Sequence, residues 1–250
     1  MTTTIIGIDW ATDPAKVGLA LGTFSPEQTV LTNVQTGNTA HQPLEVIAHW
    51  LQGREQSALL AIDAPLGWPA PLGDLLAQHS AGAVLEVPAH HLFRRTTDHF
   101  IREKIGKQSL DVGADRIART AHSALDLLGR LRERLGHEIS LGWDPSIKGI
   151  KAIEVYPAAT LAVHGISTKG YKASTGAKAR RQVWEQVAGH FKEKTEIPGI
   201  EKSSDSLDAV VCLLAAKDFL AGRTMPPPSG APVKREGWMW VRNPDDLCRQ

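Results

Sequence analysis

Three short apolar runs that each end in an acidic residue constrain this chain most. They span residues 5–10, 58–65 and 151–157. The acids are Asp9 and Asp63, at the ends of the first two runs, and Glu154, slightly earlier in the third. Unbroken runs of Ile, Val, Leu and Ala bounded by turn residues predict strands buried on both faces. Because an ionised carboxylate at the end of a buried strand is costly, each acid requires a hydrogen-bond donor, an Arg or Lys, or a metal ion.

A fourth acidic feature opens a predicted helix over residues 205–220. Asp205 and Asp208 lie three residues apart, which places both on one face of the helix. If the three strands are neighbours in the sheet, the acids at their ends and at the start of this helix lie close together and can form one site.

The order of the predicted elements favours an α/β fold of an uncommon type. Residues 5–10, 17–24 and 29–34 predict three strands with short connections, an antiparallel meander. The helical spacing over residues 42–52 predicts a crossover that brings the strand at 58–65 parallel to an earlier strand. Doubly wound folds usually alternate strand and helix from the start.

The rest of the chain is predicted to be mostly helical. Helices are expected over 114–135, 158–163, 177–191 and 205–220, and 237–241 is expected to be an edge strand. We expect one domain over residues 1–250, an inserted loop and helical cap over 64–150, and a Pro-rich C-terminal extension over 225–250.

Composition excludes little. The 250 residues are 42% hydrophobic and 22% charged, as in an ordinary globular protein, and a net charge of +1 identifies no partner. Cys212 and Cys248 are the two cysteines, so neither a disulfide framework nor a cysteine zinc site is indicated. No signal pattern or membrane-spanning run is recognised, and a cytoplasmic location is expected.

Converging carboxylates suggest metal chemistry. Two unit charges ~4 Å apart repel by about 4 kcal/mol at an effective dielectric constant of 20, and a divalent cation relieves this repulsion. Oxygen ligands suit Mg²⁺ or Mn²⁺, and two such ions can activate water and stabilise the leaving oxygen of a phosphodiester. The residues therefore suggest metal-assisted phosphodiester hydrolysis, with a nucleic acid or nucleotide as substrate.

The order of these motifs resembles the ribonuclease H-like superfamily, and the Asp-x-x-Asp-Ala sequence at 205–209 is similar to that of Holliday-junction resolvases. A more specific resemblance is to the DUF429 family, described as predicted nucleases of this fold. It is carried by Gly7-Ile8-Asp9, by residues 62–67 (Ile-Asp-Ala-Pro-Leu-Gly), 154–157 (Glu-Val-Tyr-Pro) and 205–209, and by Glu236-Gly237-Trp238. The resemblance implies a mixed five-stranded sheet flanked by helices, with catalytic, metal-binding carboxylates. These are Asp9, Asp63 and Asp208, with Glu154 and Asp205 as further candidate metal ligands.

Each residue also has a simpler interpretation. Asp205 and Asp208 suit a helix N-terminus, Asp63 suits a turn, and Glu154 suits an Arg or a backbone amide. Five basic residues are candidate phosphate contacts, although such charges are usually only solvated. They are Arg94, Arg95, Lys172, Arg180 and Arg181.

Two other functions remain open from the sequence. An actin-like ATP-dependent phosphotransferase also begins with an Asp-bearing hairpin, although no second Gly-rich phosphate loop is present. The other is a non-catalytic scaffold that has kept the fold. The sequence does not indicate the oligomeric state.

Overall fold

A computed structural model describes residues 2–36, 42–113, 115–192 and 200–247. In these ranges the chain forms one mixed sheet of six strands in the order β3-β2-β1-β4-β6-β5. The strands are β1 (Thr3–Asp9), β2 (Gly18–Phe24), β3 (Thr29–Thr36), β4 (Ser57–Asp63), β5 (Ile139–Leu141) and β6 (Gly149–Glu154).

The first three strands form the predicted antiparallel meander. β2 pairs with both β1 and β3 in antiparallel orientation, whereas β4 lies parallel to β1, and β6 lies parallel to β4. The crossover through α1 (Pro43–Leu51) therefore delivers a parallel strand, as its length predicts. The mixed α/β architecture expected from the sequence is confirmed, with one strand more than the five expected.

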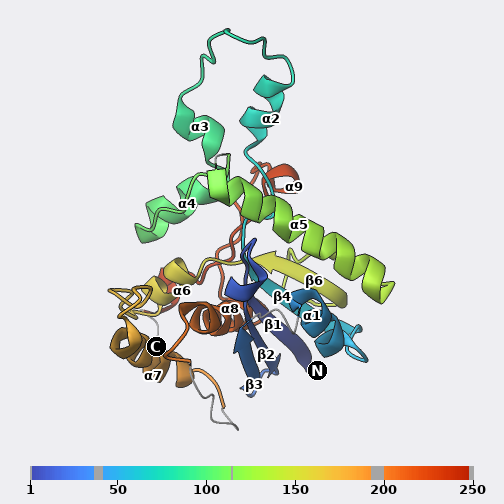
Figure 1. Cartoon of the computed structure of the whole chain (residues 1–250), viewed down its shortest axis with the longest axis vertical. Helices are drawn as coiled ribbons and strands as arrows, with labels where there is room; N and C mark the ends of the chain where they lie inside the picture. Colours follow the sequence, from blue (N-terminus) through green and yellow to red (C-terminus); the bar gives the residue numbers. More distant parts are fainter. Residues whose placement is uncertain (1, 37–41, 114, 193–199, 248–250) are drawn as a thin grey trace.

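Helices cover both faces of the sheet (Figure 1). α8 (Ser204–Leu220) lies against one face, with α6 (Pro157–Val163) and α7 (Ala177–Ala188) beyond it. α1 and α5 (Asp115–Leu135) cover the other face. The remaining segments are the 3-10 turns η1 (Pro14–Lys16) and η2 (Pro244–Leu247) and the helices α2 (Ala70–Leu76), α3 (Ala89–Phe93), α4 (Thr96–Ile105) and α9 (Val233–Glu236).

Two glycines allow α8 to lie directly on the sheet. A Cβ atom on Gly7 of β1 would collide with the Ala209 carbonyl oxygen, and one on Gly18 of β2 would collide with the Asp205 carbonyl oxygen. The first turns of α8 therefore meet the sheet backbone beside Asp9. The sequence predicts a single buried face for this helix, but the helix is buried on almost every side because α6 and α7 cover it from outside.

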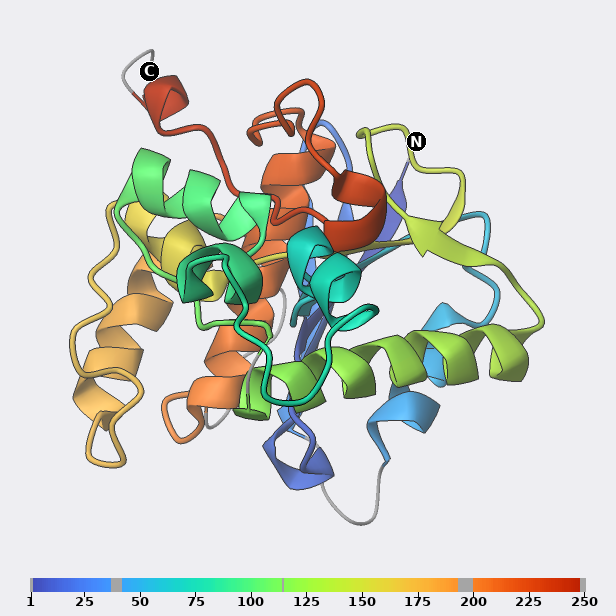
Figure 2. The same ribbon diagram turned by 90° about the horizontal axis from the view of Figure 1, so that it is seen from above.

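The insertion between β4 and β6 contains α2 to α5 together with β5. In Figure 1, α2 and α3 project from the rest of the molecule, and Figure 2 shows α9 beside α2. Arg235 of α9 forms an ion pair with Asp74 of α2, at 2.8 Å. None of the helices in the described ranges is both long and apolar enough to cross a bilayer.

The structure differs from the predicted elements in three places. β5 has only three residues, too few to produce a recognisable pattern. The helix expected over 177–191 ends at Ala188, and residues 237–241 contribute an isolated bridge from Met239 to Glu154 instead of an edge strand. Ala114 and Cys248 lie outside the described residues, and the boundaries of the inserted and C-terminal regions stay predictions.

Candidate metal centre and the buried ion-pair network beside it

Asp9 and Asp63 lie next to each other at the carboxyl ends of two parallel strands. The register of β1 and β4 pairs Asp9 directly with Asp63, so both side chains point to the same face of the sheet. This face is the one that α8 covers. Alternate residues of a strand point to the same side, so Ile5 points to the same side as Asp9, and Leu59 to the same side as Asp63. Both Ile5 and Leu59 belong to the hydrophobic core around α8. Both acids are half-buried.

Asp208 reaches the same place from α8. The Ser203 hydroxyl caps the helix by accepting hydrogen bonds from the backbone N–H groups of Asp205 and Ser206, at 3.2 and 3.3 Å. Asp208 lies in the next turn and is only 1% exposed. Its Oδ1 accepts a hydrogen bond from the Tyr171 hydroxyl at 2.9 Å, and its Oδ2 lies 2.8 Å from the Lys172 Nζ.

The three carboxylates share one electrostatic environment. Burial and the neighbouring charges of Asp63 and Asp208 raise the pKa of Asp9 well above its usual value. Burial and the charge of Asp208 raise the pKa of Asp63 to about 7. The pKa of Asp208 is raised by burial, although Lys172 and Tyr171 act in the opposite direction. Neighbouring carboxylates resist ionising together because their charges repel, and a bound cation relieves that repulsion.

Lys172 supplies the cation in this structure. Burial disfavours its charged form, but the contact with Asp208 and the nearby Asp63 and Asp9 outweigh that effect, so its pKa is raised. The loop that carries Lys172 is fixed by Arg180, whose guanidinium donates to the carbonyl oxygens of Tyr171 and Ala173, both at 2.8 Å. One ammonium group thus faces three carboxylates.

The donor set has the chemistry of a Mg²⁺ or Mn²⁺ site, since all its potential ligands are carboxylate oxygens. With Lys172 beside Asp208, no group of three or more His, Cys, Asp or Glu residues in the described ranges is arranged to hold a metal ion. Binding of a metal ion would therefore require these side chains to rearrange.

We name Asp9, Asp63 and Asp208 the carboxylate cluster. Glu154 faces away from it. Ile62, not Asp63, is its partner in the register of β4 and β6, so Glu154 points to the opposite face of the sheet. Its Oε1 lies 2.6 Å from the Arg95 Nη2, and its Oε2 accepts hydrogen bonds from the Arg95 Nη1 and the Leu66 backbone N–H, at 2.7 and 2.9 Å. The alternative interpretation of Glu154, as the partner of an Arg and a backbone amide, is the arrangement observed.

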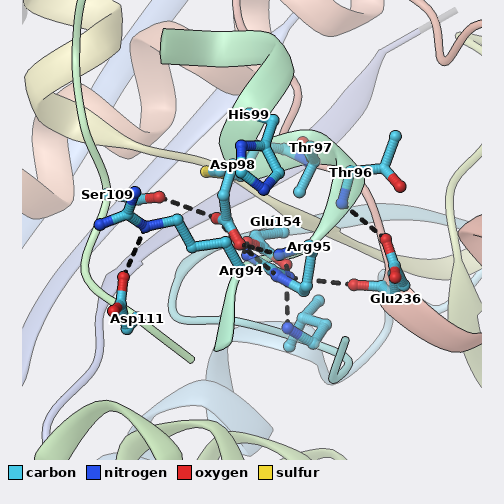
Figure 3. Close-up of polar contacts among 12 residues, drawn as sticks. Arg94, Arg95, Thr96, Thr97, Asp98, His99, Ser109, Asp111, Glu154 and Glu236 are labelled. Atoms are coloured by element: carbon cyan, nitrogen blue, oxygen red, sulfur yellow. Dashed lines mark hydrogen bonds and ion pairs between the residues drawn. The ribbon is translucent and has the colours of Figure 1, made fainter. Parts of the chain in front are cut away.

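Arg95 is the centre of this second site (Figure 3). Its guanidinium donates to Glu154 on one side and to Asp98 on the other, and Arg95 is only 1% exposed. Glu236 joins the network by accepting the backbone N–H groups of Ala70 and Thr96, at 2.9 and 2.7 Å. We name this set, Arg95, Asp98, Glu154 and Glu236, the Arg95 network.

Sequence reasoning did not identify Asp98 and Glu236 as members of a site. Glu236 belongs to the Glu-Gly-Trp motif that carries part of the family resemblance, which was the available signal. Asp98 follows Arg95 by three residues at the start of α4, where its Oδ2 accepts the Arg95 backbone N–H at 2.7 Å. That spacing is typical of an acid that caps a helix start, so it gives no separate sign of a site.

Of the remaining candidate residues, Asp205 lies near the carboxylate cluster, and Arg94 and Arg181 pair with other acids. Asp205 is half-buried, its Oδ1 accepts a hydrogen bond from the Ser204 hydroxyl at 3.1 Å, and its charge adds to those that raise the pKa of Asp9. Arg94 forms an ion pair with Asp111 at 2.6 Å. Arg181 is exposed, and its Nε lies 3.8 Å from Glu185.

A cleft of about 560 Å³ opens over the carboxylate cluster. Asp9, Asp63 and Lys172 line one part of it, and Leu110, Val112 and Ile117 of the insertion line another. Asp9 and Asp63 are therefore accessible from solvent, whereas Asp208 is buried beneath them. Arg95 and Glu154 also line the cleft, where they form an ion pair with each other.

The sheet order and the acidic strand ends define an α/β protein with the strand arrangement of the ribonuclease H-like fold. A comparison with protein families identifies the chain over residues 7–232 as DUF429, described as a protein of unknown function. The chain belongs to this family. No curated protein matches its sequence.

Among solved structures, the chain is similar to RuvC of T. thermophilus in complex with a Holliday junction substrate. The sequences are 12% identical, and the match covers 84% of this chain and 91% of that chain with a TM-score of 0.31. We infer nothing about function from a similarity this low.

Proposed function

We propose that this protein is a metal-dependent nuclease that hydrolyses phosphodiester bonds at the carboxylate cluster. The observation that carries the proposal is the pairing of Asp9 with Asp63 at the ends of β1 and β4, with Asp208 brought beside them by α8. Three like charges at the base of an open cleft are unfavourable for stability and suited to a divalent cation.

In this proposal Asp9, Asp63 and Asp208 hold Mg²⁺ or Mn²⁺, and Asp205 lies close enough to add negative charge. When bound, the metal would activate a water molecule and stabilise the leaving oxygen. Tyr171 fixes the orientation of the Asp208 carboxylate through its hydroxyl. Glu154 positions the segment after β4 by accepting the Leu66 N–H, so we assign it a positioning role and not a metal ligand role.

Two observations favour a nuclease over a phosphotransferase. The connection after Asp9 is the short turn η1, capped by the Asp13 carboxylate, which accepts the Ala15 N–H at 3.0 Å. The next residue after Asp9, Trp10, donates its indole N–H to the Ser123 hydroxyl of α5 at 2.7 Å, so this side chain is engaged with the insertion. Neither feature resembles a Gly-rich loop that cradles phosphates with backbone N–H groups.

A cytoplasmic site of action is part of this proposal. Cys212 is a free thiol buried in α8, and burial raises its pKa well above the usual value. A thiol of this kind is unreactive and does not need an oxidising compartment.

The test is calorimetric titration with Mn²⁺ of the wild-type protein and of Asp9→Asn. We expect binding in the wild type and its loss in the variant, with the fold retained, since removing one of three like charges relieves repulsion. Asp13→Asn is the matched control, because Asp13 is an exposed acid four residues away that caps η1. Equal Mn²⁺ affinity of Asp9→Asn and wild type would refute the metal site.

Hydrolysis of a phosphodiester substrate should then depend on Mn²⁺ or Mg²⁺ and disappear in Asp9→Asn. A thermal shift with ATP and Mg²⁺ that exceeds the shift with Mn²⁺ alone would favour the phosphotransferase instead, since a ligand stabilises the folded state to which it binds.

A further inference from the structure

The cleft over the carboxylate cluster has the size of a small-molecule pocket. Its volume of about 560 Å³ lies within the range of about 300–1,000 Å³ that is typical for pockets of small ligands. The space above Asp9 and Asp63 suits one or two nucleotides better than a double helix.

Residues 108–113 of the insertion form one wall of this cleft and are fixed by side-chain contacts. The Ser109 hydroxyl donates to Asp98 Oδ1 at 2.8 Å, and Arg94 Nε donates to Asp111 Oδ1 at 2.6 Å. These contacts tie the wall to α4 and to the segment just before it. We name residues 108–113 the cleft wall.

Two further contacts join the cleft wall and α5 to the site itself. The Tyr156 hydroxyl, at the start of α6, donates to the Gln108 carbonyl oxygen at 3.1 Å. The Trp10 indole, directly after Asp9, donates to the Ser123 hydroxyl of α5. Opening the cleft wide enough for a duplex would break several of these bonds.

Apolar and aromatic side chains also line the cleft. Leu110 lines the cleft although it is 68% exposed, and Val112 and Ile117 lie beside it. Trp10 and Tyr156 also line the cleft. Aromatic and apolar side chains contact the flat face of an unpaired base, and stacking of one base on an aromatic ring contributes about 1–3 kcal/mol. In a duplex that face is covered by the neighbouring base pairs.

The charges of the cleft also disfavour a duplex. The cations among the described lining residues are Arg95 and Lys172, and each already contacts carboxylates. Affinity for nucleic acid depends on Lys and Arg side chains that neutralise successive phosphates, and this dependence is steeper for a duplex than for a single strand. Here the phosphate contact would have to come from the metal site and from Lys172 once it is released.

From these observations we infer that the substrate is an unpaired nucleotide, with its base against Leu110, Ile117 and the aromatic residues and its phosphodiester over Asp9 and Asp63. This inference rests on the proposed nuclease function. The nucleotide can come from a short free oligonucleotide or from an unpaired position in a longer single strand.

The test compares the binding of three probes in the presence of Ca²⁺, which also prefers oxygen ligands. These are a dinucleotide, a 12-nucleotide single strand, and the same strand in a duplex. We expect the single strand to bind at least tenfold more tightly than the duplex. The dinucleotide distinguishes the two sources: affinity close to that of the single strand indicates a free nucleotide substrate, and much weaker binding indicates an unpaired position in a strand. Equal affinity for single strand and duplex, or tighter binding of the duplex, would overturn the inference.

The variant Leu110→Ser tests the base contact. We expect the single strand to bind several-fold more weakly while the affinity for Mn²⁺ is unchanged, because an apolar side chain is not a metal ligand. Leu76→Ser is the control, since Leu76 is a comparably exposed leucine in α2, outside the cleft lining. Unchanged binding of the single strand by Leu110→Ser would refute the proposed position of the base.

The two proposals can fail separately. If Mn²⁺ binds and Asp9→Asn abolishes that binding, but the single strand does not bind, the metal site stands and the inference about the substrate is wrong. If the wild type does not bind Mn²⁺, the proposed function itself fails, and this inference fails with it.

Discussion

The carboxylate cluster and the Arg95 network lie at the same end of the sheet and contain the same kinds of residue, but the contacts of their acids differ. In the Arg95 network, the guanidinium contacts both Glu154 and Asp98, and Glu236 accepts two backbone N–H groups. In the carboxylate cluster, Asp9, Asp63 and Asp208 face the single ammonium of Lys172. Each set contains three carboxylates and one basic side chain. The acids of the Arg95 network all have hydrogen-bond donors beside them, whereas the acids of the carboxylate cluster mainly face one another.

This difference separates a stabilising role from a ligand-binding role. A buried acid with all its hydrogen-bond partners in place holds segments together, as Glu154 does for α4 and the segment after β4. A buried acid whose pKa is raised by burial and by like charges beside it destabilises the ligand-free fold, and proteins tolerate that cost mainly at functional sites. Substitutions in the two sites should therefore have opposite effects on stability.

The largest effect is expected from Arg95→Met. Removing the guanidinium leaves Glu154 and Asp98 buried without their partner, which typically costs about 3–5 kcal/mol. Urea unfolding followed by circular dichroism measures the change. Arg94→Met is the control, because Arg94 pairs with Asp111 at a half-exposed position, where an ion pair contributes about 0–1 kcal/mol. Similar losses in the two variants would show that the Arg95 network is no more important than a surface pair.

A pH dependence is the second expected effect, and it belongs to the carboxylate cluster. The pKa of Asp63 is raised in the folded protein from 3.8 to about 7, so the folded state binds a proton more tightly than the unfolded state. The free energy of unfolding of the metal-free protein should therefore fall as the pH rises from about 4 to about 7. With about 1.4 kcal/mol per pKa unit, the expected loss is on the order of 2–4 kcal/mol.

Asp63→Asn isolates this contribution. The variant should match the wild type near pH 4 and be more stable than the wild type at pH 8, measured by urea unfolding with EDTA present. The difference arises because the amide carries no charge at any of these pH values. A constant difference in stability between the two proteins across this range would show that Asp63 ionises normally.

The sequence predicts one of these two sites much better than the other, for a physical reason. Asp9, Asp63 and Asp208 each follow from a local pattern, an apolar strand that ends in an acid or a helix that opens with one. The side to which Glu154 points depends on the register of β4 with β6, which pairs it with Ile62. That register is set by packing after an insertion of more than 80 residues, and no local pattern encodes it.

The partners of the Arg95 network are equally non-local. Arg95 meets Glu154 across 59 residues of sequence and the Glu236 carbonyl oxygen across 141 residues. From the sequence, Arg95 was a candidate phosphate contact, because its distant partners could not be recognised. In the structure Arg95 is buried and forms an ion pair with Glu154. The meander and the parallel strand were predictable because their periodicity and connection lengths are local properties.

The smallest expected effect concerns Lys172, the cation that contacts Asp208 in the described part of the chain. Its Nζ lies 2.8 Å from Asp208 Oδ2, and its side chain is 58% exposed, so it can leave the cluster without unfolding the loop that Arg180 holds. A metal ion and this ammonium compete for the same oxygens. Lys172→Met should therefore bind Mn²⁺ about tenfold more tightly, equivalent to about 1.4 kcal/mol.

Lys169→Met is the matched control, because Lys169 is an exposed residue of the same loop. The same calorimetric titration should show no change for this variant, which removes one positive charge from the loop without removing the contact with Asp208. Weaker Mn²⁺ binding by Lys172→Met would instead mean that the ammonium holds Asp208 in the geometry that the metal requires. The negative charge of the carboxylate cluster would then be balanced by Lys172 and the metal together, and the comparison with the Arg95 network would become one between two sites that both depend on a basic side chain.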